Sequence, residues 1–333
     1  MNNLIDRRTV LLSGLAAALI VLAIWALTVG SSHIAFGRVL EALWSPGEAR
    51  EDLVVWTVRL PRVVAAIAVG SALATAGAIM QAMTGNPLAE PGLLGVNAGA
   101  AFAVVLTIVF LDDIAVVGLV WAAFAGAAAA AVIVYALGAA GRAGPTPIRL
   151  VLAGVVVSTF LGSITAAILT LDAQTLDAVR LWTAGSLRGR TLPEILPVLP
   201  YVLLALAAAM LTRSQYTALS LGASVAQGLG QNQILWRGIA ALIIVGLAGG
   251  SVAIAGPAGF IGLVVPHLAR MSIGAEYRWI LPFSAIGGAL LTVVADAMPR
   301  ALLGLDVPIG VTFALIGAPY LIWLVRRRNG RFT

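Results

Sequence analysis

Long uncharged stretches dominate the chain, and short clusters of charged or turn-forming residues separate them. A bilayer core about 30 Å thick needs roughly 20 apolar residues per helix, and ten runs approach that length. The pattern therefore predicts an all-α polytopic membrane protein with about ten transmembrane helices. The predicted spans are Leu11–Gly30, Val63–Met83, Gly92–Leu111, Ile114–Ala140, Leu150–Leu171, Leu192–Leu211, Ile239–Ala255, Phe260–Ile273, Ile280–Met298 and Pro308–Val325.

Composition and charge agree with a membrane location. Hydrophobic residues make up 61% of the 333 residues, and charged residues make up 10%. Soluble domains carry roughly 25% charged residues, so most of this surface does not face water. If the spans alternate from a cytoplasmic N-terminus, twelve arginines fall inside and eight outside, which is the positive-inside bias. Both termini are thus predicted to be cytoplasmic, and the net charge of +6 reflects topology rather than nucleic-acid binding.

The residue types present exclude several chemistries. The chain has no lysine, which a P-loop needs on the nucleotide phosphates. It has no cysteine and only two histidines, His33 and His267, so thiolate and histidine-rich metal sites are not expected. We therefore predict that the chain is not an enzyme, that it holds no cofactor, and that any ATP hydrolysis occurs in a partner.

The centres of the predicted spans contain almost no ionisable residues. Ion-coupled carriers usually need such groups at mid-depth, so an energy source outside the chain is favoured. Asp296 is the nearest exception, and Arg300 one turn later is its predicted partner. Small residues four apart, as in Gly70-x-x-x-Ala74, predict close contact between helix backbones.

Several motifs occur in an order that resembles one family of transport proteins. The early motifs are Arg59-Leu60-Pro61-Arg62, Gly70 to Gly77, Gln81 and Asn86-Pro87-Leu88-Ala89-Glu90-Pro91-Gly92. The later motifs are Trp182-Thr-Ala-Gly185-Ser186-Leu187, Leu219-Ser-Leu-Gly222, Ala255-Gly256-Pro257, Phe260-Ile-Gly262, Pro266-His267 with Arg270, Pro308-Ile-Gly310 and Gly317-Ala-Pro319. From Arg59 to about Arg327 the chain is similar to the FecCD-type permeases, which import iron-siderophores, haem and cobalamin through ABC complexes.

This resemblance implies a type II ABC importer permease architecture, with residues 1–333 as one transmembrane permease domain in the bacterial inner (plasma) membrane. The expected partners are a second permease copy (a homodimer or a paralogue), two ABC ATPase subunits that hold ATP and Mg²⁺, a periplasmic or lipoprotein substrate-binding protein, and membrane lipid. The expected substrate is an iron chelate. The motif beginning at Trp182 is similar to the siderophore branch, which favours a ferric siderophore.

Three other functions are weighed against this one. A haem or cobalamin importer of the same architecture is the main alternative. A secondary carrier or channel is disfavoured by the span centres, which lack ionisable groups. A membrane-embedded enzyme is disfavoured because no cluster of His, Asp or Glu offers a metal or acid–base site.

The resemblance assigns a coupling role to the cytoplasmic loop at about residues 212–237. A short helix flanked by glycine can act there as a rigid lever on the ATPase. Many members of the family carry an acidic residue where Ala223 stands, and a solvated loop is the alternative interpretation. The predicted coupling residues are Leu219, Leu221, Gly222, Ala223, Ser224, Ala226, Leu229 and Gly230.

A cytoplasmic gate is predicted near Asn86 and Leu88. Asn86-Pro87 breaks a helix because proline lacks an N–H and disfavours helical geometry in the preceding residue. In the family this segment lies near the inner gate, and a plain interhelical turn is the alternative. Pro147 and Ile148, just before the fifth predicted span, are assigned to the same gate, although the cobalamin carriers have hydroxyl residues there.

Docking of the binding protein is assigned to Arg59, Arg62 and Arg300, which fall at the outer face in the predicted topology. In the cobalamin branch, arginines at matching places receive acidic residues of the binding protein. The planar guanidinium suits this role because it holds a carboxylate through two hydrogen bonds. Snorkelling at the membrane interface is the alternative.

Overall fold

The computed structural model describes residues 2–30, 32–45, 47–111, 115–140 and 146–329, and the regular elements among them are helices. The longer α-helices are α1 (Asn2–Thr28), α4 (Leu60–Thr84), α5 (Val96–Phe110), α6 (Val116–Ala139), α7 (Pro147–Leu171), α10 (Leu199–Leu211), α13 (Gln233–Ile244), α15 (Ile261–Ile273), α16 (Tyr277–Leu303) and α17 (Ile309–Asn329). The shorter ones are α2 (Phe36–Trp44), α3 (Arg50–Val54), α8 (Ala173–Thr183), α9 (Leu192–Ile195), α11 (Arg213–Ser220), α12 (Ala223–Gly228) and α14 (Gly250–Ala255). Two π-helical turns, η1 (Val55–Arg59) and η3 (Val245–Gly249), and a 3-10 turn, η2 (Pro91–Leu94), lie between them. The all-α prediction is confirmed.

Six helical segments in the described part of the chain are long and apolar enough to cross a membrane. They are Arg7–Thr28, Arg50–Thr84, Val116–Ala139, Ile148–Leu171, Gln233–Ala255 and Tyr277–Leu303. A seventh span results if α10 and α11, which are bent by 62° relative to each other, are counted together. Three shorter apolar helices lie where the remaining spans were expected: Val96–Phe110, Ile261–Ile273 and Ile309–Ile322. A polytopic membrane protein is confirmed, and the number ten stays a prediction.

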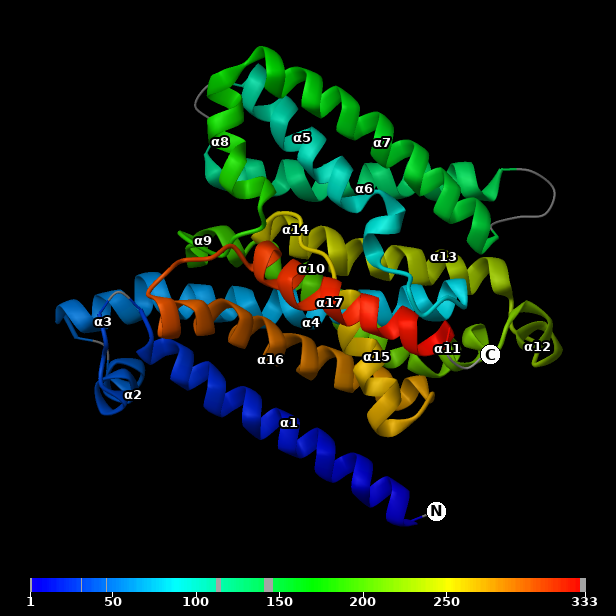
Figure 1. Ribbon diagram of the computed structural model, residues 1–333, viewed down its shortest axis with the longest axis horizontal. Coiled ribbons are helices and arrows are strands. Elements are labelled where there is room, and N and C mark those ends of the chain that lie inside the picture. The colour runs from blue at the N-terminus through cyan, green and yellow to red at the C-terminus, as the bar shows by residue number, and fades with distance from the viewer. Residues whose placement is uncertain (1, 31, 46, 112–114, 141–145, 330–333) are drawn as a thin grey trace.

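Figure 1 shows α5, α6, α7 and α8 together on one side of the bundle and α1 on the opposite side. Between them runs α4, which contacts α13, α14, α15 and α16. The start of α1, the end of α17, α11 and α12 lie toward one end, here called the α12 end. The helices α2, α3, α8 and α9 lie at the other, the α2 end. The described chain therefore starts and finishes at the same end, as an even number of spans requires.

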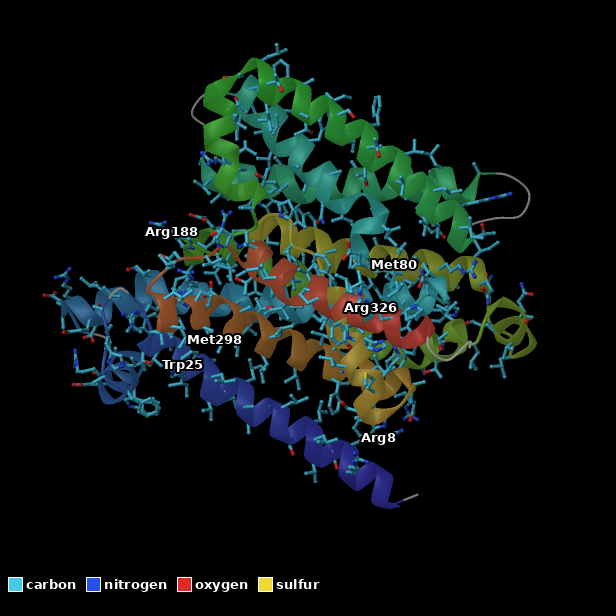
Figure 2. The ribbon with its side chains drawn as sticks, viewed as in Figure 1. Arg8, Trp25, Met80, Arg188, Met298 and Arg326 are labelled. Atoms are coloured by element: carbon cyan, nitrogen blue, oxygen red, sulfur yellow. The ribbon has the colours of Figure 1, made fainter. Side chains whose placement is uncertain are left out.

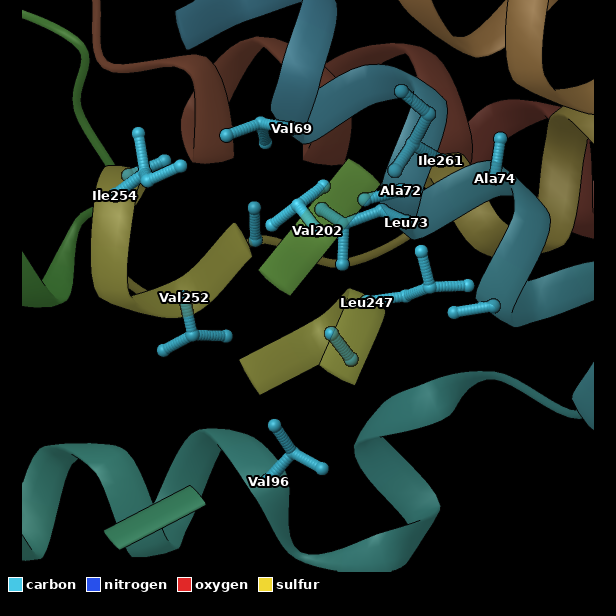
Figure 3. Close-up of a cluster of buried hydrophobic side chains, with 14 of the residues drawn as sticks. Val69, Ala72, Leu73, Ala74, Val96, Val202, Leu247, Val252, Ile254 and Ile261 are labelled. Carbon is cyan, nitrogen blue, oxygen red and sulfur yellow. The ribbon is translucent and has the colours of Figure 1, made fainter. Parts of the chain in front are cut away.

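Glycines bury α4 because they let two other helices reach its backbone. A Cβ on Gly70 would lie 2.2 Å from the carbonyl oxygen of Gly288 in α16. On the same helix, a Cβ on Gly77 would lie 1.9 Å from the carbonyl oxygen of Gly262 in α15. Side chains of α10, η3 and α14 fill the remaining space around α4 (Figure 3). The close contact predicted at Gly70 is confirmed.

Local signals set several helix ends. Gly85, with φ of +63°, ends α4 in the left-handed conformation that glycine adopts readily. Thr146 caps α7, because its Oγ1 accepts a 3.4 Å hydrogen bond from the N–H of Arg149. Pro147 and Ile148 therefore lie in the first turn of the fifth span, not before it as predicted. Proline is tolerated there because the first N–H of a helix has no intrahelical partner.

The second predicted span begins earlier than expected. The helices α3, η1 and α4 form one continuous run, Arg50–Thr84, so Arg59 and Arg62 lie inside it. Pro61 would normally interrupt such a run. The π-helical turn just before it, in which the N–H of Leu60 bonds to the carbonyl of Val55, widens the helix at that point.

The seventh span also begins earlier than predicted. Helix α13 starts at Gln233, and the side chain of Asn232 caps it by accepting a 3.1 Å hydrogen bond from the N–H of Leu235. The cytoplasmic loop thus ends several residues before Arg237. Asparagine is a favoured N-cap residue, so this boundary was readable from the sequence.

Replacing Gly70 with valine tests the α4–α16 contact. We expect Gly70→Val to cost about 1–3 kcal/mol or more, because the added atoms overlap backbone rather than a flexible side chain. The measurement is thermal unfolding of the purified protein in detergent. Gly162→Val in α7 is the control, since no atom lies within 4 Å of a Cβ there. Equal midpoints for the two variants would contradict the packing.

Candidate functional site

A buried ion network lies at the α2 end of the bundle. Arg62 of α4 donates through Nε to both carboxylate oxygens of Asp296 in α16, at 3.0 and 2.9 Å. Arg300, one turn after Asp296, donates from Nη2 to the same carboxylate at 2.7 Å. All three side chains are at most 9% exposed. The predicted Asp296–Arg300 pair is confirmed, and Arg62 joins it from a second helix.

Asp306 extends this network to the link between α16 and α17. It accepts a 2.7 Å hydrogen bond from Nη1 of Arg62, and Nε of Arg188 lies 3.9 Å from its other oxygen. Partial burial raises the pKa of Asp306, but the hydrogen bond from Arg62 and the charges of Arg62, Arg300 and Arg188 outweigh it and lower the pKa. This ion pair therefore stabilises the fold above the ordinary aspartate pKa, and its contribution is lost as the pH falls through the lowered value.

Arg59 and Arg300 fasten the end of α1. Nη1 of Arg59 donates to the carbonyl of Leu27 at 2.7 Å, and its Nη2 donates to the carbonyl of Ser32. Nη1 of Arg300 donates to the carbonyl of Val29 at 2.9 Å. The last residues of α1 and the chain after it are thus held against η1 and α16.

The three arginines predicted to dock a partner therefore lie together, and each guanidinium already has partners within the chain. Removing the partners of a buried charge is strongly destabilising, so these contacts hold the fold together. Asp296 and Asp306 lie 234 and 244 residues from Arg62, and no local pattern marks pairs so distant. The docking role stays a prediction.

The predicted coupling loop contains α11 and α12 at the α12 end (Figure 1). Leu219 of α11 is buried, and Oγ1 of Thr217 accepts a 3.3 Å hydrogen bond from the N–H of Tyr277 in α16. After α12, Nε2 of Gln231 donates to the carbonyl of Gln215 at 3.0 Å. The loop is thus anchored before and after α12, which leaves α12 projecting between two fixed points.

Three apolar side chains around α12 face outward. Leu221, Val225 and Leu229 are 57%, 47% and 67% exposed. Val225 and Leu229 are four apart and lie on one side of α12 and its last turn, whereas Leu221 is exposed just before the turn at Gly222; the three are here called the α12 stripe. Ala226 is fully buried and faces the loop's own interior. Val225 was not among the predicted coupling residues, although its spacing from the two leucines was visible in the sequence.

The other predicted coupling residues are two glycines that shape the backbone around α12 and two small residues in its first turn. Gly222 and Gly230 have φ of +97° and +79°, and both have open space where a Cβ would be. Glycine is favoured here for its conformational freedom, not for close approach of another backbone. Ser224 is exposed, and the side chain of Ala223 lies outside the described part of the chain.

The predicted gate segments lie close together at Leu93 and Gly154. Asn86 is exposed and turns the chain, because its Oδ1 accepts a 3.0 Å hydrogen bond from the N–H of the half-buried Leu88. A Cβ on Gly154 in α7 would lie 1.7 Å from the carbonyl oxygen of Leu93 in η2. Ile148 is exposed, two turns earlier on α7. The side chain of Pro147 lies outside the described residues, and the gating role of all four predicted residues stays a prediction.

Two breaks in the helices meet beside α4. Oε2 of Glu90, in the link between α4 and α5, accepts a 3.3 Å hydrogen bond from the N–H of Phe260 at the start of α15. Phe260 has φ of +67°, which is uncommon for a residue with a side chain. A Cβ on Gly317 in α17 would lie 2.5 Å from it, so the aromatic ring is packed closely against α17. Sequence reasoning gave Glu90 no role, although its motif was recognised.

Gln81, one turn after Gly77 on α4, makes a second polar contact with α15. Its Nε2 donates to the carbonyl of Gly262 at 3.1 Å, and its Oε1 accepts a hydrogen bond from Nη2 of Arg270. The early and late motifs of the sequence are therefore in direct contact. No signal within the sequence of one chain indicates this pairing.

Comparison with known proteins agrees with this architecture. The model of the FecCD transport family matches residues 18–327. The chain is 43% identical to YfiZ of Bacillus subtilis, named as a probable siderophore transport system permease protein, over 90% of each chain. It is 40% identical to FepD of Escherichia coli, a ferric enterobactin transport system permease protein, over 97% of this chain and 96% of that one.

A solved structure also matches. It is described as an ABC transporter of the metal-chelate type in an inward-facing conformation. The match has a TM-score of 0.83 at 27% sequence identity, and it covers 95% of this chain and 99% of the other. Both the sequence and the fold therefore match over nearly the whole chain.

Asp296→Asn tests the buried network. The substitution leaves Arg62 and Arg300 with a neutral partner, and we expect a loss of about 3–5 kcal/mol in unfolding free energy, because a charge is then buried uncompensated. Glu41→Gln is the control: Glu41 pairs with Arg38 at 2.6 Å on the surface, where a pair contributes about 0–1 kcal/mol. Thermal unfolding in detergent measures both variants. A shift for Asp296→Asn no larger than that of the control would disprove the role of the network.

Proposed function

This chain belongs to the FecCD transport family, and we propose that it is the membrane-spanning subunit of an ABC importer that carries a ferric siderophore across the bacterial inner membrane. The observation that carries this proposal is the match over residues 18–327 to the family. Its relatives include two permeases named for siderophore systems, one for ferric enterobactin and one for a siderophore of unstated type. The substrate class comes from those relatives and from the motif at Trp182.

Energy enters this chain through contact with a separate ATPase. We assign that contact to α12, whose stripe of Leu221, Val225 and Leu229 presents apolar surface to the outside. Exposed apolar patches of this kind mark interaction sites. Because α12 is anchored on both sides, closure of two ATPase subunits beneath a pair of permeases would move it as a rigid unit and tilt α10 and α13, which flank the loop.

The α2 end is assigned to the binding protein. Arg59, Arg62 and Arg300, with Arg188 and Arg190 nearby, outnumber the carboxylates of Asp296, Asp306 and Glu194. The cluster itself therefore carries a net positive charge, which favours acidic side chains beside it. We propose that Arg59, Arg62 and Arg300 support docking by holding α1, α4 and α16 together at this end and by leaving the cluster with a net positive charge.

The inner gate is assigned to the α12 end, between two copies of the chain. Asn86 and Leu88 turn the α4–α5 link there, and Ile148 is exposed on the first turn of α7. The contact of Leu93 with Gly154 would make the α4–α5 link and α7 move together. The α12 end faces the cytoplasm in this proposal, and both termini do as well.

Single cysteines test this orientation, because the natural chain has none. We expect Glu48→Cys, in the exposed link between α2 and α3, to react with a membrane-impermeant maleimide added to the outer face of the inner membrane. Gln227→Cys, exposed on α12, should react only after permeabilisation. Labelling of whole spheroplasts, with a cysteine-free control, distinguishes the two. Reversed labelling would refute the orientation.

Charges on the α12 stripe test the coupling. Val225→Asp and Leu229→Asp each place a carboxylate in the proposed contact with the ATPase, which would exclude water. Burying that charge costs a few kcal/mol of binding free energy, so ATPase binding should weaken more than tenfold. Gln227→Glu adds the same charge elsewhere on α12 and serves as the control. Co-purification of the ATPase and uptake of loaded chelate into liposomes are the measurements. Normal uptake by both stripe variants would show that α12 does not transmit the closure of the ATPase subunits to the permease.

A further inference from the structure

A cavity of about 470 Å³ opens at the α2 end, between α5, α6 and α8 on one side and the segments at residues 186–190 and 306–308 on the other. Ile108 of α5, Leu119 of α6 and Trp182 of α8 contribute to its apolar wall. Its polar lining comes from Arg188, Arg190, Asp306 and Ser186. This size lies in the range of small-molecule sites, which combine apolar walls with a few polar groups.

The two arginines in this cavity have unused capacity to bind an anion. Arg188 is an exposed residue, and its guanidinium approaches Asp306 only to 3.9 Å. Figure 2 shows it beside α9 at the α2 end. Arg190 is mostly buried and pairs with Glu194 at 3.4 Å, and its Nε is buried with no hydrogen-bond partner among the described residues. Each guanidinium carries five donors, so most of them remain available here.

Among the described residues, the carboxylates nearest these arginines are already engaged elsewhere. Asp306 is bound at 2.7 Å by Arg62, which also holds Asp296. Glu194 accepts a 3.0 Å hydrogen bond from Oγ1 of Thr191 in addition to its contact with Arg190. Burial lowers the pKa of Arg190, and Glu194 opposes this only in part. A bound anion would supply the missing negative charge.

We propose that this cavity binds an anionic group attached to an apolar or aromatic body, with Arg188 and Arg190 holding the anion and the wall around Trp182 holding the body. An iron chelate that presents negatively charged oxygens has this chemistry, and so does an anionic phospholipid. The chelate reading rests on the proposed function. In that reading the cavity is the first membrane-protein contact for a chelate released at the α2 end, where the binding protein is proposed to dock.

The two arginines divide this task. The side chain of Arg188 is exposed and can reach an incoming anion, whereas the largely buried side chain of Arg190 is held by Glu194. The adjacent glycine, Gly189, has φ of +73°, a backbone conformation that turns the chain between the two. Arg188 is therefore the residue to substitute first, since it is exposed, its ion pair with Asp306 is long at 3.9 Å, and its loss should leave the fold intact.

The experiment uses the complete importer, with its ATPase, in nanodiscs of zwitterionic phosphatidylcholine. Binding of an anionic ferric tris-catecholate is measured by equilibrium dialysis with radiolabelled iron. We expect Arg188→Gln to weaken binding roughly tenfold and Arg188→Glu to weaken it further, because a charge-assisted hydrogen bond is lost and then replaced by repulsion. Arg180→Gln, an exposed arginine of α8 that does not line the cavity, is the matched control. A cationic ferric trihydroxamate should show no weakening in the Arg188 variants.

A second arm tests the lipid as the source of the anion. The same variants are placed in nanodiscs that contain phosphatidylglycerol, and native mass spectrometry counts the lipid molecules retained. Arginine-dependent binding of the chelate, the lipid or both supports the anion site and identifies its ligand. If neither depends on Arg188, with the double variant Arg188→Gln and Arg190→Gln also unchanged and still folded, the proposal is wrong. Failure of the proposed function is separate, since it would appear as wild-type complex that neither binds its ATPase nor takes up any chelate.

Discussion

The structure depends on how closely other backbones can approach α4. Inside a bilayer, lipid chains are as apolar as leucine, so helices associate through van der Waals contact rather than by hiding from water. Gly70 and Gly77 let α16 and α15 touch the α4 backbone directly. With α4 fixed in this way, its start and the preceding turn η1 place Arg62 and Arg59 at the α2 end. The link that follows its end brings Glu90 to α15.

Charge is distributed very unevenly along this scaffold. Mid-span positions are nearly free of ionisable groups, whereas the α2 end gathers arginines from several segments far apart in the sequence. Arg59, Arg62 and Arg300 first serve the fold, because carbonyls and aspartates of the same chain occupy them. What remains for recognition is the surplus of positive charge within this cluster, and the exposed Arg188 carries its most accessible part.

The sequence predicted the membrane class, the family and the approximate place of each apolar helix, because hydrophobic run length is a local property. It also predicted the Asp296–Arg300 pair, which spans one helical turn. It could not predict that Arg62 and Asp306 meet, since tertiary folding alone brings them together. The predicted coupling set included Leu219 and Ala226, which are buried, and omitted Val225, because a motif match does not say which side of a short helix faces outward.

The contact between Glu90 and Phe260 affects more than the path of the chain. Helix α15 begins inside the bundle, and the exposed N–H groups at such a start carry partial positive charge that attracts anions. In this protein a carboxylate from the α4–α5 link already fills that position. The partial positive charge at this helix start is thus compensated by Glu90 of the same chain, so it does not attract a second anion. The start of α15 therefore adds no uncompensated positive charge to the interior of the bundle, whose spans are otherwise nearly free of ionisable groups.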